Sequence, residues 1–434
     1  MNNTIKLAVA AALLAGASSA NAGIMIPAGD WTLDIGGNVN AYYTSTRESG
    51  DFKGLGGATI GGSNSTNEST ESNITTGLLP NYLSVSGKTR QNDLDVGFTI
   101  SINPGSSTRQ AGIQTEPNNQ ENRQAFLTFG DKSWGSIKIG KDLGIYASDA
   151  ILNDMTLLGV GSGAGGLAGN TTTTGRIGTG FMYADWKSQV AYSSPNWNGF
   201  SFTAGVTQAW NAIAVGSVGG SATNTDRGGS SPAFEGKASY EWAGDVGGKV
   251  WVSGISQKVD NLGATAGSAA GFKFNTTTGA VDPVAAVAAS DGRDERASAY
   301  DIGGTVNVAG FGLTGYYYNG DGIGQTVQLN HGFDAKGRSR DSDGWYVQGT
   351  YTIPGVGTKL GLSYGRSELD GNSGETLDSL KDSMWTVGAY HPITKHLNLV
   401  AEYSDVKSEF DRTGALSDRE AKAKTIALGA ILFF

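Results

Sequence analysis

Hydrophobic and polar residues alternate along most of this chain, in short segments that recur from residue 31 to the last residue. In residues 424–434, Ile426, Leu428 and Leu432 share one face, whereas Thr425 falls on the other. A period of two is the pattern of a β-strand with one apolar face. The chain is therefore predicted to be all-β.

Sixteen such segments are predicted as strands, and the number is even. They cover residues 31–47, 81–89, 94–102, 122–129, 135–141, 187–193, 200–208, 234–242, 249–258, 297–308, 312–318, 344–353, 358–366, 384–391, 397–406 and 423–434. Tight turns, such as 90–93 and 354–357, alternate with long polar connections, such as 48–80, 319–343, 367–383 and 407–422. Short turns at one rim and long loops at the other are typical of a transmembrane antiparallel β-barrel.

The composition favours a barrel over a soluble two-layer sandwich, which would share the alternation. Glycine occurs 67 times, proline 9 times, and charged residues make up 16% of the chain. So few charges are unusual for a soluble surface but suit strands that face lipid. A sheet that spans a membrane must close on itself, because each unpaired backbone group in hydrocarbon costs several kcal/mol.

The first 22 residues have the order of a secretory signal peptide. One cation, Lys6, precedes an apolar run over residues 7–15, and small residues end at Ala22. This order predicts cleavage before Gly23, so that residues 23–434 form the barrel. The apolar run is shorter than the ~20 residues of a transmembrane helix.

Charge and residue chemistry argue against several functions. Without Lys6 the formal charge changes from -9 to -10, which disfavours binding of nucleic acid. The three histidines, His331, His391 and His396, lack the spacing of metal ligands, and there is no cysteine. No metal, cofactor or catalytic site is predicted, so the chain is not expected to be an enzyme.

Four stretches resemble the trimeric general porins of Gram-negative outer membranes, in particular the sixteen-stranded type of beta- and gamma-proteobacteria. They are residues 122–130 (NRQAFLTFG), 135–141 (GSIKIGK) and 190–202 (VAYSSPNWNGFSF), and the terminal Phe434. The resemblance implies an outer-membrane homotrimer in contact with lipid and lipopolysaccharide. It also implies that Phe434 is the assembly signal read by the barrel-insertion machinery.

The resemblance further implies a third loop folded into the lumen, whose acidic residues face basic residues of the wall. Residues 142–186 occupy the place of this constriction loop, and Asp149 and Asp154 are its acidic candidates. Among the basic candidates, Arg123 matches the wall arginine of the fourth strand. Its position would leave Gln124, Phe126 and Thr128 on the opposite face.

Lys138 and Lys187 are the other basic candidates, because alternation places both on the inner face. Tyr82 and Ala191 depart from the family pattern, since relatives have arginine there. The basic ladder is therefore expected to be thinner than usual. This leaves the sign of ion selectivity open.

The expected function is passive diffusion of ions and small hydrophilic solutes through a water-filled channel. Opposed charges across such a channel orient water and polar solutes and set ion preference. Two alternatives remain: a substrate-selective channel with the same barrel, and a surface adhesin or receptor whose long loops bind a ligand. Saturable block by one solute would favour the first, and ligand binding without conductance the second.

Overall fold

The computed structural model describes residues 23–51, 70–107, 120–162, 172–214, 220–224, 226–264, 267, 269–274, 279–286, 288, 291–414 and 416–434. The predicted signal peptide lies outside these described residues, as does part of the predicted loop 142–186. Within the described ranges, no helix is both long and apolar enough to cross a membrane.

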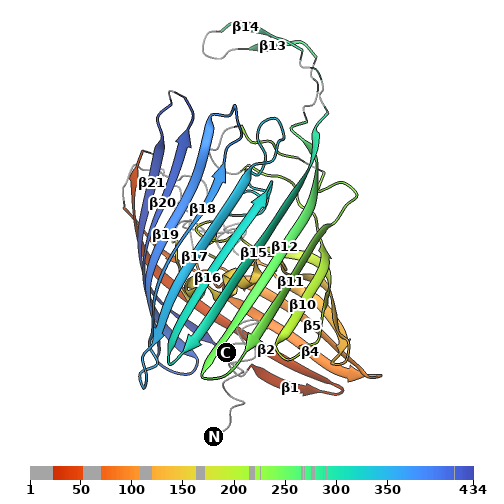
Figure 1. Cartoon of the computed structure of the whole chain (residues 1–434), viewed down its shortest axis with the longest axis vertical. Helices are drawn as coiled ribbons and strands as arrows, with labels where there is room; N and C mark the ends of the chain where they lie inside the picture. Colours follow the sequence, from red (N-terminus) through yellow and green to blue (C-terminus); the bar gives the residue numbers. More distant parts are fainter. Residues whose placement is uncertain are drawn as a thin grey trace.

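The described residues form a closed antiparallel β-barrel (Figure 1). Its wall strands are β2 (Trp31–Gly50), β4 (Tyr82–Gln91), β5 (Leu94–Pro104), β7 (Ala125–Asp131), β8 (Gly135–Leu143), β9 (Trp186–Ser193), β10 (Phe200–Thr207), β11 (Ala233–Trp242), β12 (Val246–Leu262), β15 (Arg293–Val308), β16 (Phe311–Asp321), β17 (Asp341–Thr352), β18 (Lys359–Asp370), β19 (Leu377–Pro392), β20 (Leu397–Arg412) and β21 (Arg419–Phe433). Each pairs with the next, and β21 pairs with β2 to close the ring. The predicted barrel of sixteen strands is confirmed.

Five shorter strands were not predicted. β1 (Ile24–Ala28) pairs with the start of β2, and β3 (Thr70–Thr75) pairs with its upper part. β6 (Gln120–Glu121) continues the pairing along the end of β5. β13 (Gly271–Phe274) and β14 (Val281–Val284) form a separate hairpin beyond the outer end of β12 (Figure 1).

The two ends of the described chain meet on β2. Phe434 exchanges two backbone hydrogen bonds with Gly37, of 2.9 and 3.0 Å. Ile24 is paired with Ile35, two residues before Gly37. β1 therefore pairs with the part of β2 that β21 does not reach, at the rim that carries the short turns. This pairing completes the barrel wall at that rim.

The strands β19, β20 and β21 are longer than predicted, so the predicted loops 367–383 and 407–422 are too long. Cross-strand ion pairs accompany the extension, for example Lys381 with Glu368 at 3.0 Å and Lys407 with Glu420 at 3.5 Å. Opposite charges on neighbouring strands stabilise the pairing. The ladder can therefore continue past the apolar belt into water.

The two faces of the wall differ as the alternation predicts. Leu362, on the outer face of β18, is 59% exposed, whereas the next residue, Ser363, is buried inside. On β21, Leu428 is 53% exposed and Ala427 is buried. Apolar side chains thus cover the outside, where lipid replaces water.

Candidate functional site

Residues 144–185, between β8 and β9, form a long segment that we call the inner loop. It contains helix α2 (Ser148–Asn153) and a 3-10 turn, η1 (Met155–Leu158). Its described part contacts inward-facing side chains of β11, β12, β17, β18 and β20, which belong to different sides of the barrel. These contacts place the inner loop across the interior.

Two glutamates of the wall hold the inner loop at widely separated points. One carboxylate oxygen of Glu235 on β11 accepts the backbone N–H groups of Ile145 and the residue after it, at 2.8 and 2.9 Å. Glu402 on β20 binds Val160 and the residue after it in the same way, at 2.7 and 2.9 Å. Hydrogen bonds to an ionised acceptor are stronger than neutral ones. The two carboxylates therefore fix the path of the loop.

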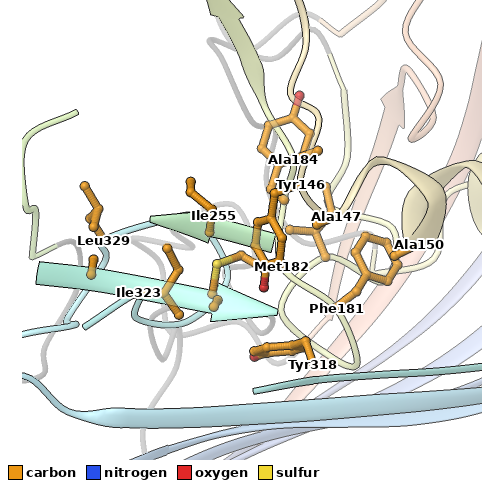
Figure 2. Close-up of a cluster of buried hydrophobic side chains, with 14 of the residues drawn as sticks. Tyr146, Ala147, Ala150, Phe181, Met182, Ala184, Ile255, Tyr318, Ile323 and Leu329 are labelled. Carbon is orange, nitrogen blue, oxygen red and sulfur yellow. The ribbon is translucent and has the colours of Figure 1, made fainter. Parts of the chain in front are cut away.

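Apolar and aromatic side chains fill the space between the inner loop and strands β12 to β17 (Figure 2). Phe181 of the inner loop packs edge-on against Tyr346 of β17, with ring centroids 5.8 Å apart. Tyr346 also donates a hydrogen bond to the carbonyl of Ala150, at 3.0 Å. The buried members include Tyr146, Ala150, Phe181, Met182, Trp251, Ile255, Tyr316, Tyr318 and Tyr346. This side of the interior is packed like the core of a soluble domain.

A second segment, residues 322–340 between β16 and β17, packs against the inner loop. The N–H of Tyr183 donates to the carbonyl of Thr326 at 2.9 Å, and the side chain of Gln328 donates to the carbonyl of Tyr183 at 3.2 Å. Thr326 and His331 have φ values of 71° and 58°, which residues other than glycine rarely adopt. Nothing in the pattern of residues 319–343 predicts this inward course.

Lys138 projects inward from β8, and 31% of its side chain is exposed. Its ammonium group lies 4.8 Å from the centroid of the Phe126 ring and forms an ion pair with Asp142. Asp142 also accepts a hydrogen bond from the side chain of Gln124, at 3.0 Å. Lys138 is thus a partly exposed cation beside a more buried carboxylate.

Arg123 lies between β6 and β7 with an almost fully buried side chain. Its Nε donates to Glu121 at 2.8 Å, and its guanidinium lies 5.6 Å from the centroid of a Trp186 ring. These contacts fix the side chain against the base of the inner loop. That Arg123 lines the pore stays a prediction.

The prediction that Phe126 and Thr128 face away from the interior is wrong. Phe126 lies beneath the ammonium of Lys138, and Thr128 is the cross-strand partner of Lys138. The cause is a bulge, because residues 100–103 of β5 pair with residues 121–125, which have one residue more. One extra residue reverses the alternation beyond it. Gln124 lies inside for the same reason.

Lys187 of β9 is fully buried, with no exposed side-chain surface. Its ammonium donates to Glu235 at 2.6 Å and to Gln328 at 2.7 Å, and it lies 4.4 Å from the centroid of a Trp210 ring. The structure therefore brings Lys187 together with the glutamate that holds the inner loop. Direct contact of Lys187 with a solute stays a prediction.

Asp149, in the first turn of α2, lies between two lysines of the wall. Its carboxylate oxygens are 2.6 Å from Nζ of Lys249 and 3.2 Å from Nζ of Lys237. Burial raises the pKa of the Asp149 carboxyl, but the two ammonium groups outweigh burial, so the pKa lies below its usual value. The charged carboxylate ties α2 to β11 and β12.

Asp154 and Arg176 of the inner loop form an ion pair with both side chains fully buried, 3.8 Å between Arg176 Nε and Asp154 Oδ1. Arg176 also donates to the carbonyl of Met384 at 3.1 Å and to the hydroxyl of Ser363. The pair therefore joins the inner loop to β18 and β19. A contact of Asp154 with a solute stays a prediction.

Lys237 and Lys249 were missing from the predicted set. Alternation alone could have identified Lys237, because Phe234 and Tyr240 on the same strand face outward and are 56% and 46% exposed. Their common partner, Asp149, could not be assigned from the sequence. That pairing depends on the path of the inner loop.

Comparison with known proteins agrees with this geometry. The family described as Gram-negative porin matches residues 8–411. No curated protein matches the chain. Among solved structures, the outer membrane channel DcaP of Acinetobacter baumannii has 15% identity and a TM-score of 0.60, covering 95% of this chain and 100% of that one.

Two further structures are similar. The anion-selective porin from Comamonas acidovorans has 13% identity and a TM-score of 0.53, with 93% of this chain and 100% of that chain covered. OmpT of Vibrio cholerae, in a trimer form, has 14% identity and a TM-score of 0.50, with 93% and 99% covered. At such identities these likenesses show the fold alone.

The family match spans most of the chain, and it agrees with a closed barrel that is apolar outside and charged inside. Members of the family are non-enzymatic channels of the outer membrane. This chain therefore belongs to the Gram-negative porin family and is an outer-membrane channel for passive diffusion.

Proposed function

We propose that the channel favours small anions over cations and that Lys138 and Lys237 line its narrow part. The observation that carries this proposal is the difference in exposure between charges of opposite sign. The side chains of Lys138 and Lys237 are 31% and 25% exposed, whereas those of Asp142 and Asp149 are 10% and 2% exposed. In each of these two ion pairs, a passing ion therefore meets the cation more directly than the acid.

The electrostatic reason is that charges beside a low-dielectric wall act more strongly than charges in bulk water. Asp149 and Asp154 of the inner loop are neutralised at close range by Lys249 and Arg176. Among Lys138, Lys237, Lys249, Asp142 and Asp149, the side chains of Lys138 and Lys237 are the most exposed. In this proposal Arg123, Lys187 and Asp154 hold the inner loop and contribute to the field, without contact with the solute.

The test is the reversal potential of the refolded protein in planar bilayers under a salt gradient. Wild-type protein should show anion preference, and Lys138→Ala together with Lys237→Ala should shift it towards cations. Lys132→Ala removes the same charge from an exposed turn and should leave the potential unchanged. Unchanged potentials in the double variant would refute the assignment of these lysines.

We further infer a homotrimer, because a porin of similar fold has been solved in a trimer form. Conductance of single insertions should then appear in groups of three steps. Single steps together with a monomeric mass in detergent would contradict the inference.

Removal of the leader before Gly23 forms part of the proposal. A Cβ atom at Gly23 would lie 1.9 Å from Oδ1 of Asp34, so the backbone of Gly23 lies close to this side chain. Because N and Cβ of a residue are about 2.5 Å apart, the nitrogen of Gly23 lies within about 4.4 Å of that oxygen. Cleavage would create an ammonium group there. N-terminal sequencing of the exported protein tests this site.

The assembly signal is assigned to Phe434, which directly follows the last strand and is 36% exposed on the outside. A side chain in this position can be read before the barrel closes on β2. Phe434→Ala should reduce insertion into the outer membrane, measured as the folded fraction in membranes. Unchanged insertion would remove Phe434 from this role.

The proposed lipid partner is lipopolysaccharide, which carries phosphate groups. The outer ends of β18 to β21 carry outward-facing cations, among them Lys381 and Lys407, each paired with glutamate. Such mixed charges can bind phosphate directly or through divalent cations. Co-purification of lipopolysaccharide that chelators do not affect would exclude the bridged form.

A further inference from the structure

The lipid-facing wall has a hollow where three small residues stand side by side on neighbouring strands. Ala204 of β10 is paired with Gly236 of β11, which is paired with Gly254 of β12. Larger side chains surround them, including Val206 and Phe234. The hollow has a volume of about 740 Å³, lies across β8 to β12 and reaches Ala299 of β15.

The backbone angles do not require glycine at either position. Neither Gly236 nor Gly254 has a positive φ. A Cβ atom added to Gly236 would lie 3.6 Å from the carbonyl oxygen of Thr203, an ordinary contact. One added to Gly254 would lie 3.3 Å from the carbonyl oxygen of Ala299, a tight contact that a shift of a few tenths of an ångström relieves. No side chain of the described structure occupies the space above them.

The adjacent Gly205 shows the contrast. A Cβ atom there would lie 2.8 Å from Cβ of Ala191 and 2.6 Å from the carbonyl of Val190, so packing inside the barrel explains Gly205. Glycine weakens a strand, and where packing does not explain it, it often marks the close approach of a ligand. Unlike other outward-facing glycines such as Gly349, Gly236 and Gly254 also line the hollow, so a ligand there could approach their backbone closely.

A cation lies at the outer end of the hollow. Ser256, two residues beyond Gly254, lines it, and Arg296 of β15 donates a hydrogen bond to the Ser256 hydroxyl at 2.9 Å. Arg296 is exposed and is the cross-strand partner of Lys258.

Among the described residues, two carboxylates pair with Lys258 and none pairs with Arg296. Lys258 pairs with Asp260 at 2.6 Å and with Asp294 at 3.3 Å. The guanidinium of Arg296 is thus a cation that contacts the lining of the hollow and that no carboxylate of the described structure pairs with. Guanidinium binds phosphate with two parallel hydrogen bonds, which suits it to a phosphorylated headgroup.

We propose that the hollow holds one acyl chain of a phosphorylated glycolipid of the outer leaflet, whose phosphate binds Arg296. The order of features matches this ligand, because the apolar floor lies towards the middle of the barrel and the cation towards its outer end. The membrane supplies acyl chains along the whole of this face. The inference rests on the proposed partnership with lipopolysaccharide and adds the site.

The test compares lipid retention by refolded barrels that have been incubated with purified lipid A in detergent and analysed by native mass spectrometry. Gly236→Leu with Gly254→Leu fills the hollow and should lower retention at least tenfold. Gly349→Leu is the matched control, because Gly349 of β17 also faces outward and an added Cβ meets nothing within 4 Å. This control should retain lipid A like wild type.

Arg296→Gln tests the headgroup. Wild type should retain lipid A better than dephosphorylated lipid A, and the variant should retain both equally. Equal retention of lipid A by all variants would overturn the proposal. A lower trimer fraction of the filled variant, with unchanged lipid retention, would also overturn it and assign the hollow to contact with a second copy.

Conductance measurements on the same proteins distinguish the proposed lipid site from the proposed ion preference of the channel. The filled variant should keep the wild-type conductance and reversal potential, because its changes lie outside the lumen. Loss of lipid binding with normal conductance would support the site independently of ion preference. If phosphate-dependent retention is absent in wild type as well, the proposed partnership with lipopolysaccharide fails together with the site.

Discussion

The two sides of the barrel interior are built differently. Towards β12 to β17, aromatic and apolar side chains of the wall, such as Tyr316 and Tyr346, pack against the inner loop. Towards β4 to β8, inward positions carry hydroxyl and charged groups, such as Ser86, Thr99 and Lys138. The part of the wall from β12 to β17 therefore serves as a packing surface for the inner loop. On the other side the wall presents polar groups to the proposed passage.

Loss of Glu235 should have the largest effect on the packed side. Glu235→Ala leaves the buried ammonium of Lys187 without its carboxylate and frees two N–H groups of the inner loop. Breaking a buried ion pair by removing one partner costs about 3–5 kcal/mol. The midpoint of guanidinium-induced unfolding in detergent, followed by tryptophan fluorescence, should fall accordingly.

Glu241→Ala provides the control on the same strand. Its carboxylate is 38% exposed and pairs with Lys249 at 3.2 Å. Removal should change the midpoint little, since exposed ion pairs contribute little. If Glu235→Ala and Glu241→Ala lowered the unfolding midpoint equally, Glu235 would not be the residue that holds the inner loop.

Phe181→Ala should cause the next largest loss of stability. It leaves a cavity between the inner loop and Tyr346, and a buried Phe→Ala change costs about 3 kcal/mol. Ion selectivity should stay at the wild-type value, because Phe181 lies on the packed side. Phe272→Ala, on the exposed hairpin, should affect neither property. A change of reversal potential in Phe181→Ala would contradict the division into two sides.

Much of the wall follows from the sequence, because each strand obeys a period of two and its neighbours in the chain are its neighbours in space. The strand from Lys359 was predicted within one residue of its start. The bulge before Ala125 was not predicted, since one extra residue leaves no mark on the pattern.

The interior follows from the sequence much less. Asp149 was proposed, but its partners Lys237 and Lys249 come from strands about 90 and 100 residues away. The inward course of residues 322–340 depends on contacts with the inner loop. Local patterns do not encode such distant contacts, whereas they do encode the alternation of a strand.

The ion pairs of Asp149 with Lys237 and Lys249 should be insensitive to mild acid. The pKa of the Asp149 carboxyl lies below its usual value. The stability that the charged carboxylate contributes is therefore fully present above the ordinary pKa of aspartate, and it is lost as the pH falls through the lowered pKa of Asp149. The difference in conductance between wild type and Asp149→Asn should thus stay constant from pH 7 to about 4 and vanish below that. A difference that disappears near pH 6 would show that the lysines do not hold the carboxylate.

The smallest effect concerns the lower rim, where neither side of the interior is involved. Oδ1 of Asp34 is buried without a hydrogen-bond partner in the described structure, and it lies beside Gly23. An ammonium group created there by leader removal would satisfy this oxygen and fasten β1 to β2. Such a pair at a rim contributes up to about 1 kcal/mol. Barrels that begin at Gly23 should therefore unfold at a slightly higher guanidinium concentration than barrels with an acetylated Gly23. In Asp34→Asn the two forms should unfold together, whereas a persisting difference would assign the effect to another partner of the ammonium group.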